Sequence, residues 1–259
     1  MTSLARAAGA ERMDEPGQDR RELERSLRDL YAVNRWLGGT RVVLGSLSEL
    51  FARHPSPAYR VLDVATGGAD IPLAVTRWAR ARGIRVHVVA TDLHPTTLEF
   101  ARRQTARDPD VTVEAADALA LPYADGAFDV ALCSTALHHF DDEGDAARVV
   151  RELWRVARIG VVVNDLARSR TALLGARLLA ATVWRTHPVT RHDGPLSVRR
   201  AFTPAELRAL AARAGVPDAR VRAHFAFRLS LVAEKHGPEG EDRDGPRDTH
   251  DPRDTHDSM

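Results

Sequence analysis

A buried strand that leads through a glycine pair into a helix is the feature that most constrains this sequence. It spans Val61-Leu-Asp-Val-Ala-Thr-Gly-Gly-Ala-Asp-Ile-Pro72. Glycine lets the backbone approach a ligand without a Cβ clash, and the following helix presents unpaired N–H groups at its N-terminus. In open α/β sheets, ligands bind beyond the carboxyl ends of the strands. The segment therefore predicts a ligand-binding loop at the edge of a parallel sheet.

The sequence around this loop alternates between expected strands and helices. Short apolar, β-branched runs predict buried strands, and the stretches between them carry apolar residues at helical spacing. This alternation is typical of right-handed βαβ units around a parallel sheet. Strands are expected at 60–65, 86–91, 111–115, 128–134 and 159–164, and helices at 70–82, 96–107 and 143–157.

Further elements flank this core. A capping box of Thr203 and Glu206 predicts the start of one helix. Residues 171–184 predict another helix, which is apolar nearly all round, so we expect it to be buried or to line an apolar pocket or interface. We predict an α/β fold, a Rossmann-like doubly wound sheet of about seven strands. The sheet is mostly parallel with an antiparallel C-terminal strand, and N-terminal helices are added. The flanking helices are expected at 20–36, 41–53, 171–184 and 202–215, and the closing strands at 219–224 and 226–233.

Both ends of the chain are predicted to be disordered. Residues 1–19 are polar, with Gly, Pro and mixed charge. Residues 236–259 contain no Val, Ile, Leu, Phe, Tyr or Trp, and they carry three Arg against eight Asp and Glu around a short repeat. Such a segment buries too little apolar surface to offset its ordering entropy. The sequence thus predicts one domain at 20–235, with its core at 58–166, followed by a disordered acidic tail.

Composition excludes several classes of protein. A net charge of +1 argues against a dedicated nucleic-acid binder. The single cysteine, Cys133, excludes an internal disulfide and a zinc cage of cysteines, and chains without disulfides are typical of the reducing cytosol. No run reaches the ~18–20 apolar residues of a spanning helix, so no stable membrane insertion is expected. We expect a cytoplasmic protein that acts on a small molecule. Whether the chain forms a homo-oligomer is left open by the sequence.

The absence of two known sequence patterns narrows the range of ligands that the glycine loop could bind. Neither the dinucleotide pattern G-x-G-x-x-G nor the P-loop pattern G-x-x-x-x-G-K-[ST] is present. Their absence weakens the hypotheses that the chain is a nicotinamide-dependent oxidoreductase or an ATP-binding protein. Asp92, which closes the second strand, can accept both hydroxyls of a ribose. Asp117 follows the third strand, and Asp125-Gly-Ala-Phe-Asp129 leads into the fourth.

In this order, these residues resemble the class I S-adenosylmethionine-dependent methyltransferases over about 60–165. The variant D-V-A-T-G-G-A-D is closest to the subgroup of ubiquinone- and menaquinone-type methyltransferases, in which an alanine such as Ala65 often replaces the first glycine. Ala65, Ala69 and the segment 157–160 depart from the wider family pattern. The resemblance implies S-adenosyl-L-methionine as cofactor. It assigns cofactor binding to Asp63, Ala65, Gly67, Gly68, Asp92, Leu93, Asp117, Ala118 and Ser134.

The resemblance also divides these residues among the parts of the cofactor. Asp63 and the backbone of Gly67 and Gly68 would hold the methionine part. Asp92 would bind the ribose hydroxyls, with Leu93 against the adenine.

Two further positions complete that division. Asp117 and the Ala118 backbone would contact the adenine amino group, and Ser134 would lie beside the methionine end.

Histidines and acids supply candidates for proton transfer. A phenol has a pKa near 10, so a neutral histidine could assist methylation of its oxygen. His139, favoured by the resemblance, and His138 follow the fourth strand, and Asp165 ends the fifth. Because successive residues point different ways on a regular backbone, the two histidines are not expected to serve one proton transfer.

A predicted loop at 186–195 adds a further candidate, His192. His187, Arg191 and Asp193 lie in the same loop. A metal site of His187, His192 and Asp193 matches no known zinc signature, so no metal is expected.

The apolar helix at 171–184 favours a lipophilic acceptor. We therefore predict an enzyme that methylates a small phenolic, polyketide-like or quinone-like molecule (EC 2.1.1.-). Segments 33–39 and 197–204 resemble bacterial methyltransferases associated with type III polyketide synthases, which points to secondary metabolism. Carbon methylation and a non-catalytic, cofactor-binding partner subunit stay open as alternatives.

Overall fold

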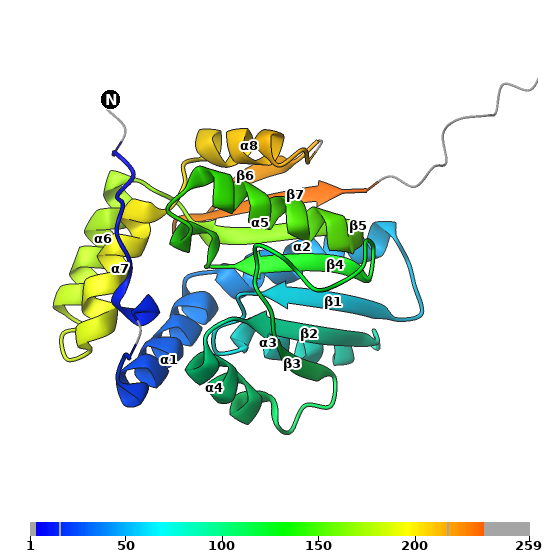
Figure 1. Cartoon of the computed structure of the whole chain (residues 1–259), viewed down its shortest axis with the longest axis horizontal. Coiled ribbons are helices and arrows are strands. Elements are labelled where there is room, and N and C mark those ends of the chain that lie inside the picture. Colours follow the sequence, from blue (N-terminus) through cyan, green and yellow to red (C-terminus); the bar gives the residue numbers. More distant parts are fainter. Residues whose placement is uncertain (1–3, 16, 217, 236–259) are drawn as a thin grey trace, which may run out of the picture.

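The parallel strands expected from the sequence form one sheet. The computed structural model describes residues 4–15, 17–216 and 218–235, and in this part of the chain a seven-stranded sheet has the order β3-β2-β1-β4-β5-β7-β6 (Figure 1). The strands are β1 (Tyr59–Val64), β2 (Val86–Asp92), β3 (Val111–Ala115), β4 (Phe128–Ser134), β5 (Ala157–Leu166), β6 (Arg220–His224) and β7 (Arg228–Glu234).

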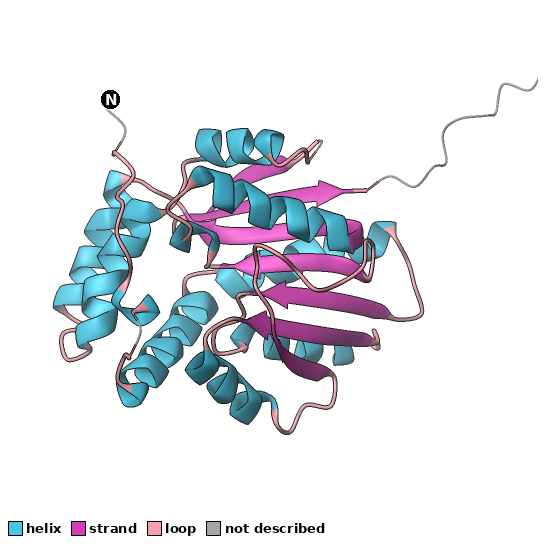
Figure 2. Cartoon of the chain, in the orientation of Figure 1, coloured by secondary structure: helices cyan, strands magenta, loops and turns pink. Residues whose placement is uncertain are grey.

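The pairing confirms the predicted fold class. β1 to β5 pair in parallel, whereas β7 is antiparallel to both β5 and β6. Every residue of β4 is buried, because helices cover both faces of the sheet (Figure 2). Double-sided burial explains why this strand is a continuous apolar run in the sequence rather than an alternating one.

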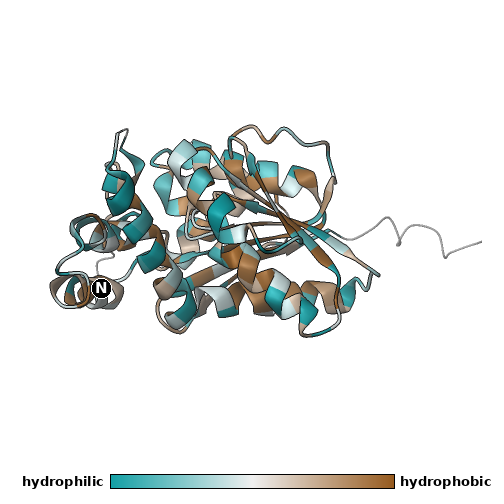
Figure 3. Cartoon of the chain, turned by 90° about the horizontal axis from the view of Figure 1, so that it is seen from below, coloured by the Kyte–Doolittle hydropathy of each residue, from teal (hydrophilic) through white to brown (hydrophobic). Residues whose placement is uncertain are grey.

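Helices pack on both faces of the sheet and form two apolar cores. One core holds Leu153 from α5 and Leu207 from α8, and the other holds Leu47 from α2 and Val75 from α3. Hydrophobic residues accordingly concentrate in the strands and on the helix faces next to them (Figure 3). These helices are α2 (Gly39–Arg53), α3 (Asp70–Arg80), α4 (Pro95–Thr105), α5 (Glu143–Val156) and α8 (Pro204–Arg213).

A third group of helices lies beyond the carboxyl ends of the parallel strands (Figure 1). It comprises α1 (Arg20–Trp36), α6 (Arg170–Ala181) and α7 (Pro188–Arg200). Two short 3₁₀ turns, η1 (Arg12–Asp14) and η2 (Leu137–His139), belong to the same region. None of the helices in the described part of the chain has both the length and the apolar character needed to cross a membrane.

The local signals at α8 are confirmed. The Thr203 hydroxyl accepts a hydrogen bond from the Glu206 amide, and the Glu206 carboxylate accepts one from the Thr203 amide. These two bonds satisfy backbone donors that would otherwise be unpaired at the helix start.

The predicted loop at 186–195 is wrong, because most of it belongs to α7. Pro188 occupies the first helical turn, where a missing N–H costs nothing, and Pro195 lies inside the helix. Gly194 and Pro195 together look like a helix break in the sequence. In the structure Gly194 is needed because a Cβ there would lie 2.7 Å from the Trp184 ring. Packing against the turn that follows α6 therefore overrides the local signal.

The predicted disorder of residues 1–19 is wrong for the described segment 4–15. The Ala7 amide donates to the Arg199 carbonyl at 3.0 Å, and Leu4 packs against the cluster that joins α6 and α7. This order depends on hydrogen bonds to residues far away in the sequence, which composition does not reveal. The predicted acidic tail at 236–259, like residues 1–3 and 16, lies outside the described residues.

Candidate active site

The glycine loop joins β1 to α3 through left-handed backbone conformations. Ala65, Gly67 and Ala69 have φ angles of 55°, 54° and 58°. The Thr66 amide donates to the Thr91 carbonyl at 2.8 Å and ties the loop to β2. Left-handed conformations cost a non-glycine residue roughly 1–2 kcal/mol. The loop therefore keeps a glycine-like shape even where alanine replaces glycine.

Two acids flank this loop, the buried Asp63 and the half-buried Asp92. Asp63 accepts a 2.6 Å hydrogen bond from the Thr66 hydroxyl, and Asp92 accepts bonds from the Gly67 amide at 2.9 Å and the His94 amide at 3.0 Å. The pKa of Asp63 is raised to about 8, mainly by burial, with smaller contributions from the carboxylates of Asp70 and Asp92. Burial also raises the pKa of Asp92. A cationic ligand would relieve the cost of ionising these acids.

The other predicted cofactor residues lie along the same sheet edge. The strand order β3-β2-β1-β4 makes the ends of these four strands neighbours. Asp117, whose carboxylate accepts from the Leu119 amide at 2.8 Å, and Ala118 follow β3. Leu93 follows β2 and is 66% exposed. Ser134 ends β4, and its hydroxyl accepts from the Asn164 side chain at 2.8 Å.

Helix α1 covers the glycine loop, which the sequence did not predict. Leu23 and Leu27 of α1 pack with Phe100 of α4 in a small apolar cluster. A Cβ at Gly68 would lie 3.2 Å from the Phe100 ring and 3.6 Å from Leu27. The backbone of the loop thus comes close to α1 and α4, and a larger residue at 68 would separate them.

A cavity of about 700 Å³ lies beside this edge. Thr135 and His138, which follow Ser134, are part of its wall, so the cavity adjoins the predicted cofactor residues through residues 134–138. Most of the wall is apolar. It includes Leu30, Val33, Leu37, Leu166, Ala172, Leu179, Trp184, Val198, Phe225 and Phe227.

The apolar helix predicted at 171–184 contributes one face to this cavity. Ala172, Ala176 and Leu179 line it, whereas Leu174 and Leu178 are exposed. The sequence thus predicted the pocket helix but not which of its apolar residues face outwards.

Three ionisable side chains from distant segments meet in the cavity wall. We call Glu11, His138 and His139 the wall cluster. The Nε2 atoms of His138 and His139 lie 3.5 Å and 3.7 Å from the two carboxylate oxygens of Glu11. The expectation that the two histidines point different ways is wrong. The two rings nevertheless turn toward the same Glu11 carboxylate, with their centroids 4.5 Å apart, because Asp165 and Asp14 hold their Nδ1 atoms on the far side.

Carboxylates hold the far side of each histidine. His138 Nδ1 lies 2.6 Å from Asp165, which also accepts from the His138 amide at 3.0 Å. His139 Nδ1 lies 2.6 Å from Asp14. Burial would raise the pKa of Asp165, but His138 outweighs it and the pKa is lowered. Burial would lower the pKa of His139, but Glu11 and Asp14 outweigh it and raise the pKa to about 9.

Arg200 and Asp193 of α7 fix the N-terminal segment that carries Glu11. The Arg200 guanidinium donates to the carbonyls of His138 at 3.1 Å and His139 at 2.6 Å, and to the Gly9 carbonyl. The Asp193 carboxylate accepts from the amides of Arg12 and Met13, both at 3.0 Å. The sequence did not predict Glu11 as a site residue, because no local pattern links it to η2.

The predicted catalytic residue His192 does not join the wall cluster. Its Nδ1 lies 2.7 Å from Asp193, and its side chain is not part of the cavity wall. Neighbouring residues on a helix point about 100° apart, so Asp193 faces inwards and His192 does not. His187 pairs with Asp29 at 2.6 Å, so His187, His192 and Asp193 do not form the metal site considered above.

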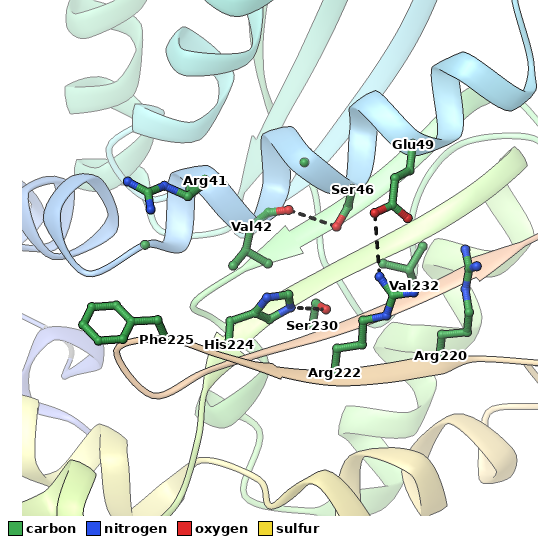
Figure 4. A pocket seen from close by; sticks show the side chains of 12 residues that line it. Arg41, Val42, Ser46, Glu49, Arg220, Arg222, His224, Phe225, Ser230 and Val232 are labelled. Atoms are coloured by element: carbon green, nitrogen blue, oxygen red, sulfur yellow. Dashed lines mark hydrogen bonds and ion pairs between the residues drawn. The ribbon is translucent and has the colours of Figure 1, made fainter.

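A second cavity, of about 290 Å³, lies between α2 and the β6–β7 hairpin (Figure 4). Among its charged side chains, Arg222 lies 3.7 Å from Glu49, and Arg220 lies 3.8 Å from Glu234. His224 lies 2.7 Å from the Ser230 hydroxyl. None of the residues predicted to bind cofactor or transfer protons lines it, so the larger cavity is the candidate active site.

Comparisons with known proteins agree with this geometry. Residues 62–163 match the family model described as "Methyltransferase domain". The demethylmenaquinone methyltransferase of Deinococcus radiodurans is 33% identical over 120 residues, which cover 45% of this chain and 47% of that protein. The enzyme of the same name from Thermus thermophilus is 40% identical over 102 residues, covering 39% and 43%. The chain thus matches about half the length of these curated relatives.

A solved structure extends the likeness of the fold. The chain superposes on a SAM-dependent methyltransferase from Aquifex aeolicus with a TM-score of 0.58 and 17% identity. The superposition covers 82% of this chain and 97% of that one. At this identity the comparison supports the fold.

Proposed function

Because the chain belongs to the class I S-adenosylmethionine-dependent methyltransferases, we propose that it methylates an oxygen of a small, lipophilic phenolic or quinone-like acceptor. The single observation that carries this proposal is the mostly apolar cavity of about 700 Å³, with its wall cluster of ionisable groups, next to the glycine-loop edge.

The glycine-loop edge fits the cofactor. S-adenosylmethionine supplies a methyl group on a positively charged sulfur. Asp63 is buried and Asp92 half-buried, and a cation beside them would lower their raised pKa values. Each Asp92 oxygen accepts one backbone amide and keeps lone pairs for a ribose hydroxyl. Gly67 and Gly68 keep the loop free of side chains where the cofactor would approach.

The remaining predicted cofactor residues suit the two ends of such a molecule. Exposed Leu93 offers an apolar face for adenine, and Asp117 and Ala118 follow the neighbouring strand, where they would reach its amino group. Ser134 lies between the loop and the cavity, where the methionine end and the acceptor would meet.

The cavity wall fits an acceptor with one polar group. Its apolar side chains would enclose a hydrophobic ring system and exclude water, and the wall cluster would bind the hydroxyl. Within the cluster His138 would take the proton, because the raised pKa of His139 keeps that histidine protonated near neutral pH. Asp165 and Asp14 would hold the histidines in place for this task. Alignment of nucleophile and methyl group is the main contribution a protein makes to this reaction.

Carbon methylation is the second candidate. The observation that favours it is the similarity to demethylmenaquinone methyltransferases, which are 33% and 40% identical over 120 and 102 residues. The same cavity would serve a quinol whose ring carbon, rather than oxygen, faces the methyl group.

Two measurements on the purified protein test the proposal. Thermal unfolding with S-adenosylmethionine, S-adenosylhomocysteine or NADH comes first. A ligand at 100 times its dissociation constant stabilises the folded state by ~2.7 kcal/mol, so we expect a shift with the two adenosyl compounds and none with NADH. A shift with NADH alone would contradict the assigned cofactor.

The second measurement is turnover with methyl-labelled S-adenosylmethionine and a panel of phenols and quinols. We expect a product that gains one methyl group as an ether, which mild demethylation removes. A methyl group that resists demethylation would show that a carbon atom, rather than an oxygen atom, is methylated. Cofactor binding without turnover on any acceptor would instead support a non-catalytic partner subunit.

A further inference from the structure

The spacing within the wall cluster suits the ligands of one metal ion. The ligand atoms of Glu11, His138 and His139 all lie within 4.8 Å of one another. The two Nε2···O distances of 3.5 Å and 3.7 Å are long for hydrogen bonds, which prefer 2.7–3.2 Å. Two ligands that bind one tetrahedral zinc ion at ~2.0–2.1 Å lie about 3.4 Å apart. The observed separations are thus closer to those of shared ligands than to those of hydrogen-bonded pairs.

Both histidines are held as metal-binding histidines are. Each Nδ1 lies 2.6 Å from a carboxylate, Asp165 for His138 and Asp14 for His139. Such a contact keeps a proton on Nδ1, so Nε2 is the nitrogen that would bind a cation, with release of any proton that it carries. Two adjacent histidines therefore direct two Nε2 atoms at the same buried carboxylate.

Glu11 supplies a second, independent observation. Its side chain is 1% exposed, and its Oε1 atom has no hydrogen-bond partner among the described residues. A buried carboxylate oxygen without a partner is costly unless a cation neutralises it. A cation between Glu11 and the histidines would remove that cost.

We propose that Glu11, His138 and His139 bind a divalent transition-metal cation, with Zn²⁺ as the best match. Two histidines and one glutamate form a donor set of catalytic zinc sites, in which a fourth position stays open. Since all three residues line the cavity, the open position faces the acceptor, whose oxygen would occupy it. The role of the ion rests on the proposed function, whereas its binding does not.

The ion would also join two distant parts of the chain. Glu11 belongs to the N-terminal segment, and the histidines belong to η2, which follows β4. Cation binding would therefore strengthen the docking of residues 4–15 on the cavity. The sequence predicted no metal because His187, His192 and Asp193 match no zinc signature. Glu11 was not a candidate ligand, since it lies in a segment predicted to be disordered.

Binding of Co²⁺ and Zn²⁺ to the full chain, after dialysis against a chelator, tests this proposal without cofactor or acceptor. We expect a single cation per chain by titration calorimetry, and a tetrahedral Co²⁺ absorption spectrum that Zn²⁺ abolishes. Glu11→Gln should weaken binding more than about 100-fold. Asp14→Asn, which changes only the support of His139, should weaken it by about 10–100-fold.

Matched controls separate binding from folding. Glu15→Gln changes an exposed acid on the same segment, and His192→Gln changes a histidine of α7 that points away from the cluster, so both variants should bind the cation like the natural chain. A thermal shift with S-adenosylmethionine would show that Glu11→Gln is folded. Absence of cation binding by the natural chain, or equal binding by Glu11→Gln, would overturn the site.

The role of the ion has a test of its own. Where an acceptor is found, chelator should lower turnover and added Zn²⁺ should restore it. Full turnover in chelator would overturn the role in catalysis while leaving the methyltransferase assignment intact. Conversely, failure of every acceptor in the panel would leave the binding measurement unaffected.

Discussion

The glycine-loop edge and the cavity wall face each other, but the chain builds them in different ways. The loop edge is made of consecutive strand ends, so Asp63, Asp92 and Asp117 follow one another as the sheet is built. The wall cluster joins residue 11 to residues 138 and 139, and α7 holds them together. A site built from one repeated βαβ pattern can be predicted from the sequence, whereas a site built from distant segments cannot.

The largest effect is expected at Asp92. Asp92→Ala should weaken S-adenosylmethionine binding by at least 100-fold, about 3 kcal/mol, because it removes an acceptor for ribose hydroxyls and for the Gly67 and His94 amides. Titration calorimetry would measure this change. Asp117→Ala, on an exposed side chain of the same edge, is the matched control and should have a smaller effect. An unchanged dissociation constant for Asp92→Ala would contradict the proposal that Asp92 binds the ribose hydroxyls.

A pH dependence of stability is expected from Asp63. Its pKa is about 8 in the folded protein, raised mainly by burial, against an ordinary value near 4. Between these values the unfolded chain releases the proton and the folded chain keeps it, so stability falls as pH rises towards 8. Asp63→Asn cannot ionise, so in the cofactor-free protein it should gain about 2 kcal/mol over the natural chain between about pH 6 and pH 8.5.

Denaturant unfolding at the two pH values would measure that gain. Asp145→Asn, at an exposed position in the first turn of α5, is the control and should differ little from the natural chain at either pH. A gain that is the same at both pH values would mean that Asp63 is ionised throughout, and that the loop edge carries a fixed negative charge.

The fold and the loop edge could be predicted because their signals are local. The Thr203–Glu206 capping box, the buried run of β4 and the Gly67–Gly68 loop each specify their own structure within a few residues. Residues 4–15 and α7 could not, since their order depends on long-range bonds such as Arg6 to the Arg200 carbonyl at 2.6 Å. Because of the same dependence on long-range contacts, the sequence did not predict Glu11 as a site residue and wrongly placed His192 in the site.

Asp193→Ala tests whether the two halves of the site are independent. Loss of its carboxylate removes the bonds to the Arg12 and Met13 amides and loosens the segment that carries Glu11. We expect kcat/KM for the acceptor to fall about 10-fold, some 1.4 kcal/mol, while the dissociation constant for S-adenosylmethionine stays within about twofold.

The neighbouring histidine offers the control for this experiment. His192→Ala removes a side chain that contacts Asp193 but does not line the cavity, so it should leave both quantities nearly unchanged. An equal loss of cofactor binding in Asp193→Ala would show that the segment supports both halves, and the contrast between them would not hold.

The smallest effect is expected where the loop departs from the family pattern. Ala69 has a φ of 58°, and glycine would relieve about 1–2 kcal/mol of strain while adding about 0.5–1 kcal/mol of unfolded-state entropy. Ala69→Gly should therefore stabilise the protein by about 0.5 kcal/mol, which raises Tm by about 1–2 °C. Ala74→Gly, within α3, should lower Tm instead, because a helical alanine carries no such strain. If both substitutions lowered Tm, the left-handed turn at Ala69 would not be strained, and its alanine would be as well suited to the loop as glycine.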